Sequence, residues 1–234
     1  MPASGTGPGV ITPDGCAVEF YALLEPTGEP EIVHAAVPAG ASILELGAGA
    51  GRVTHPLVAL GHPVVAVDES AEMLAHIRGA ETVQAGIQDL DLGRRFDVVL
   101  LASFPVNTDD RDLRGRFLQA CSRHLRDDGC LLVQRHPPRW FDEAAEGERV
   151  TEGIVFRLRD LRRPGPGLLE ATAEYQVGGR VWTQTFTAER LDDEALAAAL
   201  AGAGLAVDAY LTGDGSWVRA VAVSSGRALG RSPR

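Results

Sequence analysis

Short apolar runs alternate with amphipathic stretches along the first 140 residues. Residues 42–46, 63–67 and 96–102 are almost entirely apolar, as expected for strands buried on both faces. Residues 110–125 instead place apolar side chains at the spacing of a helix. Strands and helices that alternate in this way predict an α/β, doubly wound, mostly parallel sheet with helices on both faces.

Weaker signals complete this alternating unit. Residues 52–60 and 71–78 are predicted helices, with Ser70 as the N-cap of the second. Residues 82–85 and 130–136 are predicted to be two further strands. Because ligands of such sheets lie beyond the carboxyl ends of the strands, we expect the functional site at that edge.

The pattern changes after Trp140. Three longer runs there predict antiparallel strands: 154–159, 168–176 and 180–188. Gly178-Gly179 predicts a tight hairpin turn between the last two. Antiparallel strands do not continue a doubly wound core, so we expect an inserted β segment after strand five that shapes a substrate pocket or a dimer contact.

The chain returns to the first pattern near its end, where residues 191–201 predict a helix and residues 205–211 and 217–223 a final strand pair. Both termini are rich in small and polar residues, which predicts flexible ends. The expected organisation is a flexible arm, a main domain in two pieces, the insertion and a flexible tail: 1–13, 14–140 with 189–224, 141–188 and 225–234.

Composition narrows the class of protein. The 234 residues carry a net charge of −10 and are 45% hydrophobic, with three cysteines and no metal-ligand spacing. An acidic surface argues against sequence-independent nucleic-acid binding, which requires a basic face. The first ten residues lack a signal peptide's charged and apolar regions, and no apolar run is long enough for a membrane span. We therefore expect a cytoplasmic protein without a metal.

The stretch ELGAGAGR, which begins at Glu45, suggests a nucleotide-type ligand. Glycines let the backbone turn sharply and approach a ligand closely. A dinucleotide fingerprint would place its last glycine at position 52, but Arg52 stands there and Gly51 comes one residue early. Asp68, at the end of the next strand, is placed to accept ribose hydroxyl protons in either a nicotinamide or an S-adenosylmethionine site.

Glu45 favours the second ligand, because an acid two residues before the first glycine suits a sulfonium and an ammonium better than a pyrophosphate. With ILELGAGAGR, VVAVDES, FDVVLLASFP and LRDDGCLLVQRH, the chain resembles the class I S-adenosylmethionine-dependent methyltransferases that act on small molecules. The resemblance implies a Rossmann-like seven-stranded sheet with an antiparallel seventh strand and S-adenosyl-L-methionine as cofactor.

The resemblance also implies which residues bind the cofactor. Gly47 and Gly49 should lie against its methionine part and Asp68 should hold its ribose. The acid that usually follows strand three is replaced by Gly86, so Gln88, Asp89 or a backbone amide should meet the adenine. The full expected set is Glu45, Gly47, Ala48, Gly49, Asp68, Glu69, Gln88, Asp89, Ala102 and Ser103.

Residues near the carboxyl ends of strands are candidates for catalysis. His136 ends strand five and could act as a base or orient the acceptor. Tyr21 resembles a tyrosine that covers the cofactor in small-molecule members. Four residues could bind the substrate: Arg135, Arg139, Trp140 and Asn107. Trp182 and Phe186 could line the acceptor pocket. Each of these residues has a purely structural alternative.

The expected function is methylation of nitrogen or oxygen in a small metabolite by a monomer or homodimer. Composition rich in alanine, glycine and arginine associates the chain with natural-product pathways. Three alternatives stay open: ring closure of the cofactor with release of methylthioadenosine, a non-catalytic cofactor-binding protein and a nicotinamide oxidoreductase. The proline motif of DNA amino-methylating enzymes is missing after strand four, where SFPV stands.

Overall fold

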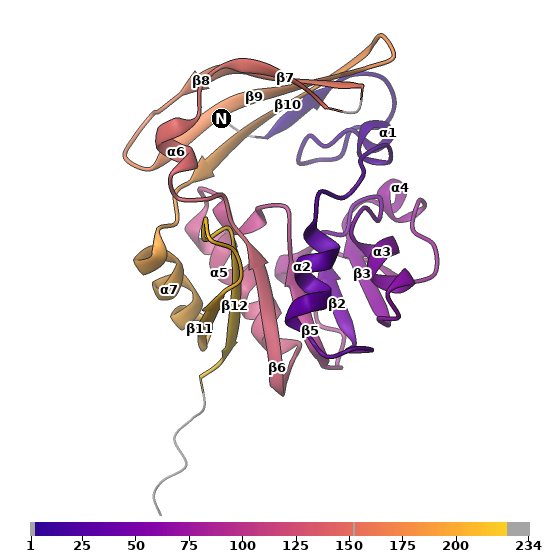
Figure 1. Ribbon diagram of the computed structural model, residues 1–234, viewed down its shortest axis with the longest axis vertical. Coiled ribbons are helices and arrows are strands. Elements are labelled where there is room, and N and C mark those ends of the chain that lie inside the picture. The colour runs from indigo at the N-terminus through magenta and orange to yellow at the C-terminus, as the bar shows by residue number, and fades with distance from the viewer. Residues whose placement is uncertain (1–2, 152, 224–234) are drawn as a thin grey trace, which may run out of the picture.

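A seven-stranded sheet forms the lower layer of the computed structural model, which describes residues 3–151 and 153–223 (Figure 1). Its strand order is β11-β12-β6-β5-β2-β3-β4, and only β12 runs antiparallel to its neighbours. The strands are β2 (Ile43–Leu46), β3 (Val64–Asp68), β4 (Glu81–Gln84), β5 (Phe96–Leu101), β6 (Leu125–Gln134), β11 (Leu205–Tyr210) and β12 (Trp217–Ala222). The expected mostly parallel, doubly wound sheet is confirmed.

Burial on both faces explains why the central strands are continuous apolar runs. Every residue of β2 is buried, and so is nearly every residue of β5. One apolar cluster covers the face toward α5 (Arg111–Arg123) and α7 (Asp193–Gly202), and a second covers the face toward α2 (Glu29–Ala36) and α3 (Thr54–Ala59). Within the described ranges, no helix is long and apolar enough to cross a membrane.

The helix after β3 is shorter than the sequence suggested. Ser70 is the expected N-cap, since its hydroxyl accepts from the amide of Met73 at 3.1 Å. However, α4 covers only Ala71–Leu74 and not residues 71–78. The next amides bond three residues back, and Gly79 then turns the chain with φ 76°. The α3 helix likewise begins at Thr54, two residues later than expected.

A five-stranded antiparallel sheet forms the upper layer and lies over the carboxyl ends of the parallel strands (Figure 1). Its strands are β1 (Ser4–Thr6), β7 (Gly147–Thr151), β8 (Ile154–Arg162), β9 (Leu168–Val177) and β10 (Arg180–Glu189), in the order β1-β10-β9-β8-β7. Gly178 and Gly179 form the expected two-residue turn, both with positive φ. The sequence missed β7, because all five residues of this edge strand are exposed and give no burial pattern.

The N-terminal segment differs from the expected flexible arm over residues 1–13. Residues 4–6 form β1, whose partners in β10 are residues 183–185, and the Trp182 indole donates to the carbonyl of Pro8 at 2.8 Å. Local composition cannot report pairing with a strand about 180 residues away, which is why the prediction was wrong here. The expected tail at 225–234 lies outside the described residues.

Side chains of the upper sheet divide between an inner face, which points toward the lower sheet, and an outer face. Phe20 of α1 (Val18–Tyr21) packs against Trp182 and Tyr175 at one end of the inner face. At the other end, α6 (Trp140–Glu143) packs Phe141 against Leu158. The two short helices therefore connect the upper sheet to the functional edge of the lower one (Figure 1).

Candidate functional site

The glycine turn follows β2 at the functional edge. Gly47 and Gly49 have φ values of 74° and 56°, in the left-handed region that favours glycine. A Cβ at Gly49 would meet no atom within 4 Å, and one at Gly47 would meet only Ile87 Cδ1, at 3.7 Å. The space beside both glycines is therefore open to a ligand. Gly51 differs, because a Cβ there would collide with the His55 ring at 2.6 Å.

Asp68, at the end of β3, holds the glycine turn in place. One carboxylate oxygen accepts from the Gly49 amide at 2.8 Å, and the other accepts from the Ser70 amide at 2.9 Å. Burial raises the pKa of Asp68 although these amides lower it. Each oxygen can accept a second hydrogen bond, so Asp68 still has acceptor capacity toward a ligand.

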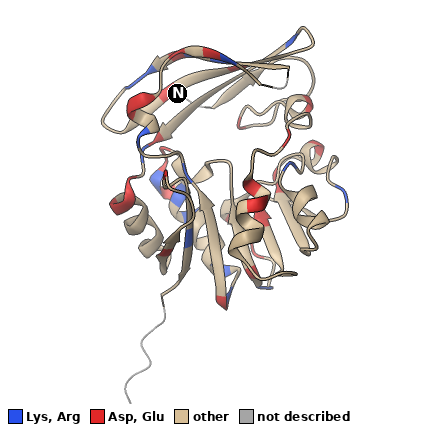
Figure 2. Ribbon diagram, viewed as in Figure 1, with Lys and Arg blue, Asp and Glu red and all other residues tan. Residues whose placement is uncertain are grey.

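Four carboxylates at this edge interact electrostatically: Asp14, Glu45, Asp68 and Glu69. Glu45 is buried, accepts from the Thr54 hydroxyl at 2.6 Å, and has its pKa raised to about 7 chiefly by burial. Burial also raises the pKa of Glu69, and the charges of Asp14 and Asp68 raise it further. Figure 2 shows further acidic residues at the start of α2 and near α4. The site is therefore suited to a cationic ligand.

Arg52 connects the glycine turn to two other segments. Its guanidinium forms an ion pair with buried Glu29 and donates to the Ser103 hydroxyl at 3.2 Å. Burial acts to raise the pKa of Glu29, but the hydrogen bond and charge of Arg52 outweigh it and lower that pKa. Sequence reasoning missed this pair. The available signal was an arginine directly after the glycines.

The loop after β5 holds an unusual backbone. Ser103 and Phe104 have φ values of 63° and 71°, which side chains other than glycine adopt only under strain. The Ser103 amide donates to Gln134 Oε1 at 2.8 Å, so the loop is fixed to the end of β6. Ala102, just before it, is buried. Strain of this kind is typical of functional sites.

The segment after β4 borders the glycine turn through a residue that the sequence analysis passed over. Ile87, in the short 3-10 helix Ile87–Asp89, lies closest to Gly47. Gln88 is half-buried beside Gly86, whereas Asp89 and Glu69 are exposed. Ala48 is buried under the turn. The structure thus brings most of the expected cofactor residues together at one edge, with Asp89 outermost.

His136 lies in a stack of aromatic rings. Its imidazole is 4.0 Å from the Phe104 ring and 4.2 Å from the Trp140 ring, at interplanar angles of 10° and 12°. Burial lowers the pKa of His136 to about 4, so the ring is neutral near pH 7. Asn107 fixes its backbone: Oδ1 accepts from the His136 amide at 2.8 Å while Nδ2 donates to the Glu189 carbonyl at 2.9 Å.

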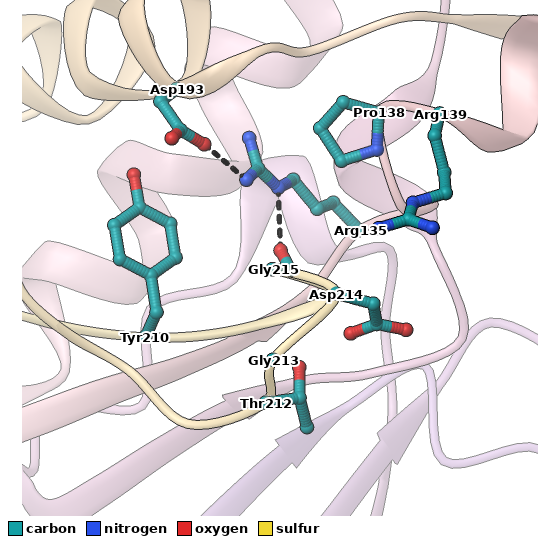
Figure 3. Close-up of a pocket in the computed structure, with 9 residues that line it drawn as sticks. All are labelled: Arg135, Pro138, Arg139, Asp193, Tyr210, Thr212, Gly213, Asp214 and Gly215. Carbon is teal, nitrogen blue, oxygen red and sulfur yellow. Dashed lines mark hydrogen bonds and ion pairs between the residues drawn. The ribbon is translucent and has the colours of Figure 1, made fainter.

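Arg135 lines the cavity of Figure 3, but its guanidinium is occupied by contacts within the protein, which argues against the expected substrate role. Its guanidinium donates to the Gly215 and Leu191 carbonyls at 2.8 and 2.7 Å and pairs with Asp193. The side chain is 1% exposed. Arg135 thus ties β6 to α7 and to the β11–β12 turn, as Figure 3 shows.

Arg139 lies apart from the glycine turn. It is exposed and lines a cavity of about 340 Å³ beside the β11–β12 turn, opposite Thr212 and Asp214 (Figure 3). No residue of the glycine turn lines that cavity. Trp140, which borders the neighbouring depression, has one ring face on His136. The structure therefore separates Arg139 from the cofactor residues and keeps Trp140 near His136.

Tyr21 lies between the inner face and the glycine turn. Its hydroxyl donates to Gln184 Oε1 at 3.0 Å, and burial with the nearby Cys16 raises its pKa well above the usual value. Val18, one turn earlier, packs with Ala50 of the glycine turn. The N-terminal segment thus joins the two layers.

Trp182 and Phe186 occupy two parts of the inner face. Trp182 is fully buried under the N-terminal segment and is core. It therefore does not line a pocket, contrary to expectation. Phe186 packs with the cluster around Phe141. Among residues 3–151 and 153–223, no group of three or more His, Cys, Asp or Glu side chains could hold a metal ion.

Comparison with known proteins identifies relatives of the lower layer. A family model described as a methyltransferase domain matches residues 43–129. A ubiquinone biosynthesis O-methyltransferase of Nitrobacter winogradskyi is 30% identical over 110 residues, which are 44% of this chain and 41% of that protein. The chain therefore spans about two fifths of the length of this curated relative.

Solved structures share most of the fold. The CcbJ methyltransferase of Streptomyces caelestis aligns with a TM-score of 0.69 at 23% identity, over 82% of this chain and 93% of that one. A calicheamicin-pathway amino pentose methyltransferase of Micromonospora echinaspora, solved with S-adenosylmethionine bound, aligns with a TM-score of 0.64 at 21% identity. That match covers 88% of this chain and 92% of that one.

Three observations point to the same kind of protein. They are the strand order, the glycine turn that is hydrogen-bonded to Asp68, and the matching methyltransferase domain. On these grounds residues 43–129 match a methyltransferase domain, and the chain shares the fold of S-adenosylmethionine-dependent methyltransferases.

Proposed function

We propose that this protein transfers the methyl group of S-adenosyl-L-methionine to a nitrogen or oxygen atom of a small metabolite. The observation that carries the proposal is the glycine turn, which is open beside Gly47 and Gly49 and fastened to the carboxylate of Asp68. The match to a methyltransferase domain supports the cofactor, and the upper sheet over the strand ends supports an enclosed acceptor (Figure 1).

The residues of this edge fit the cofactor chemically. S-adenosylmethionine, when bound, supplies a methyl group already activated by a positive sulfonium. The carboxylates of Asp68, Glu69 and Asp14 favour that positive charge and the cofactor's ammonium. Asp68 has acceptor capacity left for the ribose hydroxyls, and Ile87 offers an apolar surface beside Gly47 for the base. These roles are part of the proposal.

On the acceptor side, His136 is the proposed orienting group. A neutral imidazole held between Phe104 and Trp140 can accept a hydrogen bond from an N–H or O–H of the acceptor. With a pKa of about 4 it is a weak base, so its contribution is alignment more than proton removal. Tyr21 is proposed to cover the cofactor from the other side, where Gln184 fixes its hydroxyl.

The setting is proposed from the relatives. The similar Micromonospora echinaspora protein belongs to calicheamicin biosynthesis, and a partly matching Streptomyces protein is a cypemycin N-terminal methyltransferase. These two relatives are thus named for an amino pentose and for cypemycin. By extension, this protein is proposed to be a cytoplasmic enzyme that acts on a natural product or a related small metabolite.

Calorimetric titration tests the cofactor half of the proposal. S-adenosylmethionine should bind the wild-type protein, and Asp68→Asn should weaken that binding by about tenfold, since one charge-assisted acceptor is lost. Asp127→Asn, at an exposed carboxylate near the start of β6, is the control and should change little. Absence of binding to the wild-type protein would refute the proposal.

Mass spectrometry tests the reaction. The protein is incubated with S-adenosylmethionine alone and then with a mixture of small amines and phenols, and both nucleoside by-products are measured. Methyl transfer predicts S-adenosylhomocysteine that appears only with an acceptor. Methylthioadenosine formed from the cofactor alone would instead identify ring closure.

A further inference from the structure

The arginines on the two faces of the upper sheet have different contacts. On the outer face, Arg157 contacts Glu148 and Glu174, both at 2.6 Å, and Arg159 contacts Glu174 at 3.2 Å. On the inner face, Arg149 contacts no carboxylate within residues 3–151 and 153–223. Its guanidinium instead lies 4.5 Å from the centre of the Phe156 ring.

Strand register places Arg149 at one end of an aromatic row. Arg149 pairs with Phe156, Phe156 with Tyr175 and Tyr175 with Trp182, so these four side chains share the inner face. Arg180 on the same face forms an ion pair with Glu19 of α1 at 2.9 Å, and Arg190, beyond the end of β10, pairs with Asp142. Within residues 3–151 and 153–223, Arg149 is therefore an inner-face cation with no carboxylate in contact.

The aromatic row also leads to the proposed acceptor residues. Phe156 packs with the cluster that contains Trp140 and Phe141, and Trp140 stacks on His136. Apolar and aromatic side chains thus connect Arg149 with the imidazole. The carboxylates, in contrast, gather at the cofactor end around Asp68.

We infer that the acceptor carries a carboxylate, which Arg149 binds while the apolar body of the acceptor lies along Phe156 and Trp140. A planar guanidinium resting on an aromatic ring is suited to a carboxylate, because the ring fixes its plane and leaves its N–H groups free at the edge. This inference rests on the proposed function and specifies its substrate class.

Paired probes that differ only in charge test the inference. The two probes, 4-biphenylcarboxylate and 4-biphenylcarboxamide, are titrated into protein saturated with S-adenosylhomocysteine, and their dissociation constants are measured by calorimetry. The wild-type protein should bind the carboxylate about tenfold more tightly than the amide. Arg149→Gln should remove that preference and leave amide binding unchanged. Arg159→Gln, on the outer face, should behave as wild type.

The outcomes separate this inference from the proposed function. Equal affinity of both probes for the wild-type protein, no binding of either, or a preference that survives Arg149→Gln would each overturn the role of Arg149. Binding of S-adenosylmethionine is measured on the same preparations. Its loss from the wild-type protein would overturn the proposed function, whereas its retention with no effect of Arg149→Gln would overturn only the substrate class.

Discussion

Single residues decide whether this edge can hold a ligand. Gly49 must adopt a left-handed backbone and must also leave space beside itself, so two independent constraints meet at one position. Asp68 likewise serves the fold by accepting from the Gly49 amide and still keeps capacity for a ligand. At residue scale, therefore, substitutions can separate what the backbone requires from what the ligand requires.

Gly49→Ala should weaken S-adenosylmethionine binding by at least about tenfold, because its methyl group enters the open space and the left-handed backbone costs about 1 kcal/mol. Gly61→Ala is a matched control, since Gly61 has φ 89° and equally open surroundings on the far side of α3. Thermal unfolding should show similar losses of stability for both variants. Calorimetry should show lost affinity only for Gly49→Ala, and equal affinities would contradict the assignment.

Burial of His136 as a neutral ring makes the free energy of unfolding depend on pH, with a defined sign. Its folded pKa of about 4 lies below the usual 6.5, so the unfolded chain binds more protons between these values. The stability that His136 contributes to the folded state is fully present above pH 6.5. It is lost as the pH falls toward 4, by up to about 3 kcal/mol. Glu45, with its pKa raised to about 7, acts in the opposite direction over part of that range.

Comparison with His136→Phe isolates the histidine, because phenylalanine keeps the ring stack and cannot titrate. Urea unfolding at pH 7.5 and at pH 5 should show a larger loss of stability for the wild-type protein than for the variant. The same pH dependence in both proteins would show that His136 is not buried as a neutral ring.

At the scale of elements, the N-terminal segment connects the two layers. Gln184 of β10 accepts from the Tyr21 hydroxyl at 3.0 Å and donates to Cys16 Sγ at 3.2 Å. Val18 then packs with Ala50 and Met73 beside the glycine turn. Contacts with one strand of the upper sheet therefore position a segment that lies against the cofactor edge.

Gln184→Leu should loosen this segment, because the buried Tyr21 hydroxyl loses one hydrogen-bond acceptor at a cost of about 1 kcal/mol. Hydrogen exchange followed by mass spectrometry should show faster exchange in residues 12–21, and S-adenosylmethionine should bind several-fold more weakly. Gln176→Leu, on the outer face of the adjacent strand, is the control, since Gln176 contacts Arg157 instead. Faster exchange in both variants would argue against a specific connection.

The whole molecule carries a net charge of −10, and its acidic site lies in the field of that charge. S-adenosylmethionine has a positive sulfur, whereas the sulfur of S-adenosylhomocysteine is neutral. Long-range attraction should therefore favour the substrate over the product of methyl transfer. Salt screens this attraction over a distance of about 10 Å at 0.1 M ionic strength.

Raising the salt concentration from 0.05 to 0.5 M should therefore weaken S-adenosylmethionine binding several-fold and affect S-adenosylhomocysteine less. Calorimetry at four salt concentrations measures both dissociation constants. Parallel changes for the two ligands would show that the acidic residues do not discriminate by charge.

Much of the lower layer could be predicted from the sequence. Continuous apolar runs such as 63–67 indicate parallel strands, because strands that are buried on both faces lack alternating polar positions. The glycine turn and Asp68 were predictable for a related reason: their backbone requirements are local and leave a local signature. The helix cap at Ser70 is local as well.

Only the tertiary structure decided what depends on distant partners. The pairing of residues 4–6 with β10 and the burial of Arg135 among Gly215, Leu191 and Asp193 join segments far apart in the chain. A charged side chain looks the same in a sequence whether its partner is a substrate or a distant carbonyl. The sequence by itself thus determined the sheet and its glycine turn, because their requirements are local. Long-range packing decided which arginines make only internal contacts, such as Arg135, because their partners are distant in the chain.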